Sequence, residues 1–388
     1  MNQTTLVPQE IKARAVRAAL SHGAGAVRVT AARADALSRR RMAEAFERGD
    51  FTTWGYDAAY ARRATDPRAL LPDARSVICI AVPYASPPVR EAAPLRGRVS
   101  NYAWPEDYHH RVRDLLRLVA GEIDAAVGAC VTAIACDTRP LSERALAAAA
   151  GLGWIGKHTN LISPSLGSFV FLGEVVTTLE LPADVPLRKS CGECRRCIEA
   201  CPTQALRGDY TIEATRCISD LTQRADAIPV VMRPLIGEWV WGCDLCQLVC
   251  PPTIAAGTSR SSQWKPASHE TAQPALLELL ALRSGEFKQR YQKTAMGWRG
   301  AAVLRRNAAV ALGNALDRSA VGALVESLER DPHPMVRGHV AWALGRIASP
   351  KALAELRRRR SLEQDGTVRS EIEAALEPFR WVGREREV

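Results

Sequence analysis

The sequence predicts an α+β protein with several parts. Residues 1–182 form a mixed part of helices and strands, residues 183–256 a small cysteine-rich part, residues 257–285 a linker and residues 286–388 an all-helical part. Three observations predict this division: short β-branched runs between helical patterns, eight regularly spaced cysteines, and a repeat near the end of the chain. A chain of 388 residues is long enough to bury two or three separate cores.

The first part predicts helices and buried strands in turn. Residues 1 to about 45 are rich in Ala and Arg with apolar residues at helical spacing, so we expect helix there. Short β-branched runs at 73–83, 131–136 and 168–179 predict buried strands, with helices at 111–126 and 141–150 between them. The linker is rich in Gly, Ser, Thr and Pro, which suits a surface segment.

Two polar groups in the first part are candidates for chemistry. Asp137 ends the strand at 131–136 and precedes a helix, so it could cap that helix or face a cleft as a proton donor. The residues alone favour the cap. Asp107 precedes the pair His109 and His110, which could bind a metal or lie solvated at a capped helix start. The residues favour the capped start.

A glycine-rich loop begins at Gly151 and formally matches G-x-G-x-x-G. The dinucleotide-binding fingerprint requires a strand before the first glycine. Here a run of alanines with helical character precedes it, which excludes that function. The loop carries Lys157, His158 and Asn160, and its glycines would let the backbone approach a ligand closely.

The cysteine-rich part predicts two iron–sulfur clusters. It contains C-x2-C-x2-C-x3-C-P from Cys191 to Pro202, a lone Cys217, and C-x2-C-x3-C-P from Cys243 to Pro251. In two-cluster ferredoxins the cysteine before proline binds the other cluster. This rule assigns one [4Fe–4S] cluster to Cys191, Cys194, Cys197 and Cys250, and the other to Cys201, Cys217, Cys243 and Cys246. Zinc sites do not need the third cysteine or the Cys-Pro steps, and a disulfide framework suits small secreted domains.

The last part contains a repeat of 32 residues. Leu304-Arg305, Val336-Arg337 and Val368-Arg369 recur at this interval, each followed by apolar residues at helical spacing. Stacked helix pairs of this kind form HEAT-like solenoids. Residues 286–388 contain 19 Lys or Arg and 13 Asp or Glu, and the whole chain has a net charge of +10. The repeated Arg could contact phosphates or lie on a solvated face, and the pattern leaves both open.

The first residues lack the basic and then apolar run of a signal peptide, and no apolar run reaches the ~18 residues of a membrane span. We therefore expect a cytoplasmic protein without membrane contact. A cytoplasmic location also suits reduced thiols and iron–sulfur clusters.

These motifs together resemble the epoxyqueuosine reductase family over nearly the whole chain. The resemblance is carried by Tyr102-Ala-Trp104, Asp107-Tyr-His109, Asp137-Thr138, Gly151-Leu-Gly-Trp-Ile-Gly-Lys157-His-Thr-Asn160-Leu, the eight cysteines, and Cys217-Ile-Ser219-Asp-Leu-Thr222. The family is similar in design to reductive dehalogenases. The resemblance implies a cobalamin-binding α/β sandwich domain at 1–182, a ferredoxin-like domain with two [4Fe–4S] clusters at 183–256, and HEAT-like repeats at 286–388. It also implies reduction of epoxyqueuosine to queuosine at the wobble position of tRNA, the last step of queuosine synthesis.

The resemblance also implies roles for single residues. Asp137 becomes the proton donor, against the cap that the residues alone favour. The D-x-H-x-x-G cobalt-ligand motif would need Gly where the chain has Val112, which agrees with cobalamin bound without a protein imidazole. We expect cobalamin to border Tyr102, Asp137, Lys157, Asn160, Leu161, Ser168, Leu172, Ser219 and Thr222. We expect tRNA to contact Arg299, Arg305, Arg306 and Asn307.

The expected partners are tRNA that carries epoxyqueuosine and an electron donor such as a flavodoxin, a ferredoxin or a similar reductase; we expect a monomer. Two other classes stay open. A reductive dehalogenase would share the cofactors but usually carries an export signal and needs no basic solenoid. A non-enzymatic electron carrier would need the clusters but no cobalamin.

Overall fold

The computed structural model describes residues 7–87, 94–129, 131–258 and 268–377. The chain folds into two compact units, each made of segments that are far apart in the sequence. The first unit comprises Met1–Pro88, Trp104–Cys217 and Asp244–Lys265, and the second comprises Val89–Ala103, Ile218–Cys243 and Pro266–Val388. Among the helices in the described ranges, none is both long enough and apolar enough to cross a membrane.

The first unit is built on a four-stranded antiparallel sheet with the order β1-β2-β7-β4. Its strands are β1 (Ala26–Ala31), β2 (Ser76–Pro83), β7 (Val170–Thr177) and β4 (Thr132–Ala135). The central strands β2 and β7 are almost wholly buried, as expected for strands covered on both faces. The three strands predicted from β-branched runs are thus confirmed.

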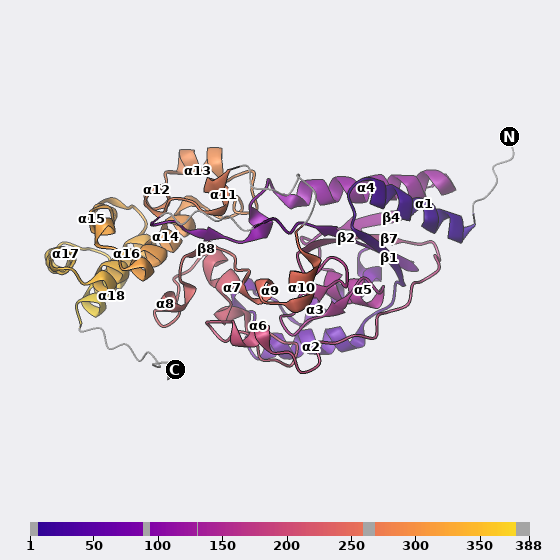
Figure 1. Cartoon of the computed structure of the whole chain (residues 1–388), viewed down its shortest axis with the longest axis horizontal. Coiled ribbons are helices and arrows are strands. Elements are labelled where there is room, and N and C mark those ends of the chain that lie inside the picture. Colours follow the sequence, from indigo (N-terminus) through magenta and orange to yellow (C-terminus); the bar gives the residue numbers. More distant parts are fainter. Residues whose placement is uncertain (1–6, 88–93, 130, 259–267, 378–388) are drawn as a thin grey trace. The chain divides into compact units, whose positions relative to one another are not determined.

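Helices cover both faces of this sheet (Figure 1). Helices α1 (Pro8–Ser21) and α4 (Tyr108–Val127) pack together on one face, where Gly173 of β7 leaves room for Leu116 of α4. Helix α5 (Glu143–Ala149) packs on the other face, against β2 and β7. Side chains alternate along a strand, so odd-numbered residues of β7 face α4 and even-numbered residues face α5.

The prediction of helix through residues 1–45 is wrong in its middle. The structure has α1, then β1, then α2 (Ala36–Glu47). Helix α1 ends because Gly23 adopts φ +101°, in the left-handed region that only glycine enters freely. Val27 and Val29 then alternate into the core, while Arg28 between them is exposed. The composition favoured helix, but this alternation was the signal of an edge strand.

The rest of the first unit consists of short elements. The glycine-rich loop contains a hairpin of β5 (Trp154–Ile155) and β6 (Leu161–Ile162). Single helical turns lie beside the cysteines: α6 (Arg196–Glu199), η4 (Ala214–Arg216), α9 (Leu245–Leu248) and α10 (Pro251–Ala256). Between β1 and β2 lie α2, η1 (Thr52–Trp54), α3 (Ala58–Ala64) and η2 (Pro67–Ala69).

The second unit begins with a parallel pair of short strands, β3 (Arg98–Val99) and β8 (Trp239–Trp241). The remaining elements before the repeats are η3 (Asn101–Ala103), α7 (Ile218–Gln223), α8 (Arg233–Ile236), α11 (His269–Ala272), α12 (Leu276–Leu280) and α13 (Ser284–Arg290). Helices α7 and α8 and strand β8 all pack against the first repeat helix. Residues 218–243 therefore fold with the repeats, although the sequence division placed them in the cysteine-rich part.

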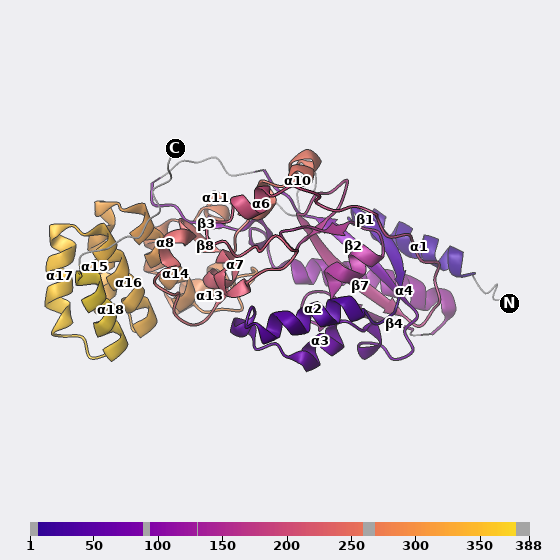
Figure 2. The same cartoon turned by 90° about the horizontal axis from the view of Figure 1, so that it is seen from below.

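The repeats form a stack of helices (Figure 2). The stack contains α14 (Ala301–Ala315), η6 (Arg318–Ala320), α15 (Val321–Arg330), α16 (Pro334–Ile347), α17 (Pro350–Arg360) and α18 (Gly366–Leu376). Gly313 and Gly345, one repeat apart, let neighbouring helices approach closely. A Cβ at Gly313 would lie 2.7 Å from the Trp342 ring, and one at Gly345 would lie 2.6 Å from the Ala375 carbonyl oxygen.

Two of the three repeated Arg residues bind carboxylates of their own stack. Arg305 pairs with Asp331 at 2.6 Å, and Arg337 pairs with Glu363 at 2.9 Å. Each acid lies 26 residues after its Arg, so the pairing itself repeats. Arg369 donates to the Glu363 carbonyl at 2.8 Å. Arg305 and Arg337 therefore link successive helices of the stack rather than lying on a solvated face, whereas Arg369 is exposed.

Candidate functional site

The candidate acid site lies at the end of β4. Asp137 follows this strand with φ +54°, and its side chain is 59% exposed, whereas the preceding Cys136 is buried. Its backbone N–H donates to the carboxylate of Glu143 in the first turn of α5. The N-cap of α5 is Ser142. The cap that the residues alone favoured for Asp137 is therefore wrong, and its carboxylate is available for other contacts.

His109 joins two carboxylates. Its Nε2 lies 3.1 Å from Asp137 Oδ2, and its Nδ1 lies 2.6 Å from Asp107 Oδ1. Asp107 also caps α4 by accepting the His109 N–H at 3.1 Å. The predicted capped helix start is thus confirmed, but the prediction of solvated imidazoles is wrong for His109, whose side chain is only 17% exposed. His110 is exposed.

The hydrogen bonds set the protonation of this site. The hydrogen bond from His109 lowers the pKa of Asp137 although burial opposes the effect. Burial alone would lower the pKa of His109, but its bonds to Asp107 and Asp137 raise it to about 9. The site therefore holds its exchangeable proton on His109 at neutral pH. The hydrogen bond from the neighbouring imidazolium therefore outweighs burial in its effect on the pKa of Asp137.

A row of stacked rings holds His109 in place. Tyr108 stacks on His109 with 4.1 Å between ring centroids, and on Phe171 of β7 with the same spacing. Tyr84, just after β2, stacks on the same Phe171 at 4.1 Å. Because one of these rings lies in β7 and another directly follows β2, the imidazole has a fixed support beside Asp137.

The structure brings together the thiols predicted for the first cluster. After burial, the three other thiols of the set are the largest causes that raise the pKa of Cys197, to about 11. Cys191 and Cys194 also raise the pKa of Cys250. Thiols act on each other in this way only at short range. A bound cluster would remove their protons, because metals bind the thiolate form. This donor set fits the predicted cluster.

Hydrogen bonds reach two of the predicted cluster sulfurs. Lys157 donates its backbone N–H to Cys191 Sγ, and Ala205 donates to Cys201 Sγ, both at 3.4 Å. Such bonds raise the reduction potential of a cluster. The second ligand set is divided between the two units: the first unit contains Cys201, Cys217 and Cys246, and Cys243 ends a segment of the second. This ligand set therefore stays a prediction from spacing. In the described ranges no three His, Cys, Asp or Glu side chains are set as for a single metal ion.

The glycine-rich loop packs against the protein itself. A Cβ at Gly151 would lie 2.4 Å from the Val185 carbonyl oxygen, and one at Gly153 would lie 2.2 Å from the Ile162 carbonyl oxygen. These glycines permit close approach of the chain's own backbone rather than of a ligand. Lys157 Nζ donates to the Gly192 carbonyl at 2.7 Å, so the end of this loop is tied to the cluster-binding turn.

The other predicted cobalamin residues of the first unit are more deeply placed. Leu161 and Leu172 are 2% and 9% exposed and belong to the core beneath α5. Ser168 is buried and its hydroxyl lies 2.9 Å from that of Thr253. Asn160 accepts the Gly156 N–H at 2.9 Å through its carbonyl, which closes the hairpin.

The predicted cobalamin residues of the second unit have partners within it. Tyr102 accepts a hydrogen bond from Trp241 Nε1 at 2.9 Å. The Thr222 hydroxyl accepts the Gly242 N–H at 2.9 Å, and Ser219 Oγ accepts from Gln223 at 2.9 Å. Contact of these side chains with cobalamin stays a prediction.

Three of the residues predicted to contact tRNA are buried in the second unit. Arg306 is 0% exposed and donates to the carbonyls of Leu221, Thr222, Arg224 and Asp226. Asn307 is 1% exposed and donates to the Thr222 and Val240 carbonyls. Arg305 is held by Asp331. Arg306 and Asn307 thus bind the repeats to residues 221–240, and of the four predicted residues only Arg299 is partly exposed.

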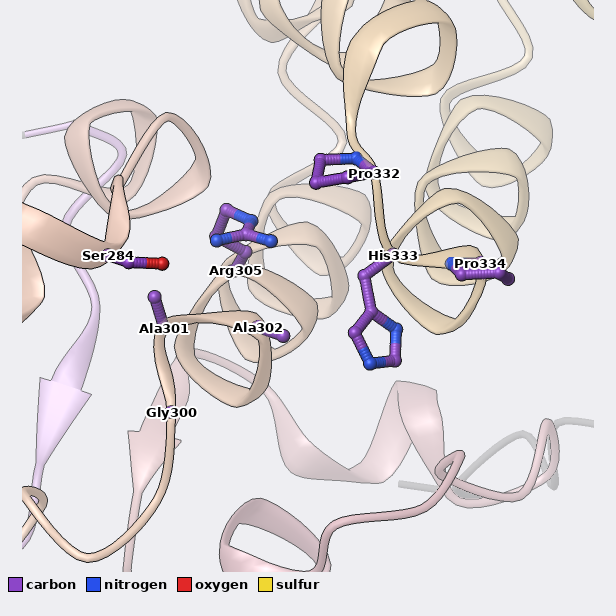
Figure 3. Close-up of a pocket in the computed structure, with 8 residues that line it drawn as sticks. All are labelled: Ser284, Gly300, Ala301, Ala302, Arg305, Pro332, His333 and Pro334. Atoms are coloured by element: carbon purple, nitrogen blue, oxygen red, sulfur yellow. The ribbon is translucent and has the colours of Figure 1, made fainter.

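A shallow depression lies at the helix starts of the repeats (Figure 3). It has a volume of about 370 Å³, and among its lining residues Arg305 lies between Ser284 and His333 in the view of Figure 3. The starts of α14 and α16 border it through Gly300, Ala301 and Pro334. Helix starts favour anions through their free N–H groups.

Two carboxyl groups near the acid site were not predicted from the sequence. Glu143 binds the backbone of Asp137, and Glu174 lies fully buried in β7. A signal for the second was present: Glu174 is the one charged residue in an otherwise apolar strand run from Val170 to Thr177. Glu is almost never fully buried unless it is paired, so a Glu in such a strand is a candidate for a special role.

Three family models match the chain. They are a 4Fe-4S double cluster binding domain at residues 190–253, epoxyqueuosine reductase QueG at 64–138, and HEAT repeats at 300–377. These matches confirm the double-cluster and repeat predictions.

Curated relatives and solved structures agree with the family models. Epoxyqueuosine reductase of Bacillus subtilis is 36% identical over 327 residues, which is 83% of this chain and 84% of the relative. That of Salmonella typhimurium is 38% identical over 285 residues, 72% and 73% of the two chains. A crystal structure of epoxyqueuosine reductase with an epoxyqueuosine-modified tRNA stem loop matches with a TM-score of 0.89 and 33% identity, over 95% of this chain and 98% of that one. A Bacillus subtilis structure whose catalytic aspartate loop is swung out of the active site matches with a TM-score of 0.88, 32% identity and the same coverage.

Identity above 30% across most of both chains, together with the matched fold, leads to one conclusion. The chain belongs to the epoxyqueuosine reductase family.

Proposed function

We propose that this protein reduces epoxyqueuosine to queuosine in tRNA, and that Asp137 and His109 deliver a proton to the substrate oxygen. The observation that carries the proposal is the hydrogen-bonded pair of Asp137 and His109 on the loop after β4, in a chain of this family. The relative crystallised with an epoxyqueuosine-modified tRNA stem loop supports the substrate. The relative whose catalytic aspartate loop is swung out of the active site supports an acid at such a position.

The reaction needs electrons and protons in equal number. Opening the epoxide and releasing its oxygen as water, with formation of the alkene, consumes two electrons and two protons. Two [4Fe–4S] clusters suit single-electron delivery, and the double-cluster match supports their presence. Cobalamin, when bound, passes these electrons to the epoxide.

The residues present fit a cobalamin that takes no protein imidazole. Both ring nitrogens of His109 are engaged by carboxylates, so this histidine does not offer a nitrogen to cobalt. His158 is buried and accepts the Asn160 N–H through Nδ1. Asp137 is exposed on its loop and can face a bound substrate. Lys157 and Asn160 remain our proposed contacts to the corrin from the first unit.

The acid site works by moving one proton at the moment when charge develops. As the ring opens, negative charge grows on the epoxide oxygen, and a positioned acid lowers the barrier by neutralising it. His109 holds the proton through the hydrogen bond to Asp137. Transfer through the carboxyl of Asp137 to the oxygen leaves a neutral imidazole, which Asp107 still orients at 2.6 Å.

An exposed pair of Trp and Arg side chains in the second unit supports tRNA binding. Trp298 is 52% exposed, and the Arg299 guanidinium lies 3.9 Å from its ring centroid. An exposed ring and a guanidinium suit stacking on a base beside a phosphate contact. We propose this pair as part of the tRNA surface. We further propose a monomer in the cytoplasm that takes electrons from a flavodoxin- or ferredoxin-type donor.

Nucleoside mass spectrometry tests the proposed function. The anaerobically reconstituted protein is incubated with a strong reductant and tRNA bearing epoxyqueuosine, with and without cobalamin, and the tRNA is digested. We expect the modified nucleoside to lose one oxygen only when cobalamin is present. An unchanged nucleoside, with both clusters intact and cobalamin bound, would contradict the proposed substrate. Failure to bind cobalamin would indicate an electron carrier.

A further inference from the structure

Glu174 is a buried carboxyl that packing does not explain. It lies in the middle of β7, opposite Cys79 of β2 and opposite Ala135 of β4. Its side chain is 0% exposed, and neither carboxyl oxygen has a hydrogen-bond partner. An ionised carboxylate in such a place is strongly unfavourable, and an apolar residue would fill the space more stably.

The fold directs Glu174 towards the acid site. Even-numbered residues of β7 face α5, so Glu174 lies on the sheet face that α5 covers. Helix α5 begins with Glu143, and the Glu143 carboxylate accepts the backbone N–H of Asp137. Ala135, opposite Glu174 in the register, is two residues before Asp137. The three carboxyl groups thus follow one another from the sheet interior to the exposed loop.

The groups around Glu174 keep it neutral. Burial raises its pKa well above the usual value, and the charge of Glu143 raises it further. Burial, and then Asp137, raise the pKa of Glu143 to about 8, although the Asp137 N–H and the charges of Arg144 and His109 oppose this. The thiols of Cys79 on β2 and Cys136 after β4 also have raised pKa values and remain uncharged. Both carboxyl groups therefore carry protons at neutral pH.

The proposed reaction requires more protons than the acid site holds. Two protons are consumed in each turnover, whereas the Asp107–His109–Asp137 group holds one exchangeable proton, on His109. The second proton reaches Asp137 either from solvent, since its side chain is 59% exposed, or from a neighbouring acid. Glu143 is in contact with the Asp137 backbone, and Glu174 lies behind it, away from solvent.

We propose that Glu143 and Glu174 form a buried proton reserve that recharges Asp137 within each turnover. In this step the O–H bond of Glu143 breaks as an O–H bond forms on Asp137, and the proton of Glu174 then replaces the one that Glu143 has lost. No electrons move, and the reserve is refilled from solvent after product release. Both residues act through Asp137 and are positioning residues. The inference rests on the proposed function only in its demand for a second proton.

Glu174→Gln separates a proton reserve from a space-filling side chain. Gln has the shape and neutrality of a protonated Glu, so a purely structural Glu174 would tolerate it without loss. We expect at least a tenfold fall in kcat, an unchanged KM for tRNA, intact cluster spectra and a changed pH profile. Glu143→Gln keeps an acceptor for the Asp137 N–H and should have a similar effect. The double variant should be no slower than the slower single variant, because both act in one path.

Cys79→Ala is the matched control. It changes the residue paired with Glu174 on β2 and leaves both carboxyl groups in place, so we expect the wild-type kcat and pH profile. Wild-type kcat and pH profile in Glu174→Gln would overturn the proposal.

Infrared difference spectroscopy of the protein without cobalamin or tRNA gives a second measurement. We expect a carboxylic acid C=O band at pH 7 that shifts in D2O and disappears in Glu174→Gln. If that variant does not fold, the carboxylic acid band of the wild-type protein and the change in that band in Glu143→Gln still test the proposal. A wild-type protein without a protonated-acid band would overturn the proposal. Because this infrared measurement needs no substrate, it tests the proton reserve independently of the proposed function.

Discussion

The protonated state of His109 should limit activity at high pH, and Asp107 should set that limit. Asp107 and Asp137 raise the pKa of His109 to about 9 from an ordinary 6.5 against the effect of burial. Asp107→Asn removes one of these two charges. Asn is also a good N-cap, so the start of α4 should be kept.

The size of the effect follows from the charge that is lost. An opposite charge within about 4–6 Å shifts a pKa by about 1–3 units, so in Asp107→Asn we expect the pKa of His109 near 7. At pH 8 the protonated fraction would fall from about nine-tenths to about one-tenth. The rate of epoxyqueuosine reduction at pH 8 should then fall about tenfold, with little change at pH 6.

The assay is the initial rate of queuosine formation from pH 6 to pH 10 at saturating tRNA. Asp114→Asn is the control, because Asp114 lies on the same helix, pairs with Arg117 and is 72% exposed. We expect the control to keep the wild-type alkaline limb. An alkaline limb at the same pH in wild type and Asp107→Asn would refute the assignment of the proton to His109.

Three further predictions concern the second unit. Arg305→Ala should lower the free energy of unfolding by roughly 3–5 kcal/mol, measured by heat or urea, because Asp331, which is 4% exposed, then lacks its cation. Unchanged stability together with weaker tRNA binding would instead indicate that Arg305 contacts tRNA. Gly345→Ala should cost about 1–3 kcal/mol by forcing α16 and α18 apart. The control Gly322→Ala, whose Cβ would meet nothing within 4 Å, should stabilise helix α15 by up to about 1 kcal/mol. Although burial opposes the effect, hydrogen bonds from Arg337 and Arg359 lower the pKa of Glu363 to about 2. Its contribution is therefore present above the ordinary pKa of 4.5 and lost as pH falls towards 2, and Glu363→Gln should flatten this acid limb of the unfolding profile.

Features with a local chemical cause could be predicted from the sequence. The cysteine spacing is required by the cluster itself, so it can be read without a fold. The strands at 76–83 and 170–177 were evident because burial on both faces demands continuous apolar residues. The 32-residue repeat was evident because each helix pair needs the same apolar positions to stack on the next.

Features that depend on distant contacts could not be predicted. His109 and Asp137 are 28 residues apart in the sequence, and they meet only because α4 packs against β4 in the fold. The repeated Arg residues suggested a row of phosphate contacts. The acids that bind two of them lie 26 residues further along the chain, so the sequence does not reveal the pairing. Arg306 looked like a surface cation, but the carbonyls that enclose it come from residues 221–226, which the sequence division placed in another domain.

Asp137 is the residue that we propose as the acid when this chain reduces epoxyqueuosine. The most direct measurement compares wild type with Asp137→Asn in a single turnover on epoxyqueuosine-modified tRNA, read by nucleoside mass spectrometry. Iron content and the bound cobalamin spectrum are recorded for both proteins. We expect loss of one oxygen with wild type and an unchanged nucleoside with Asp137→Asn at equal cofactor content. Equal conversion by the two proteins would show that Asp137 is not the acid.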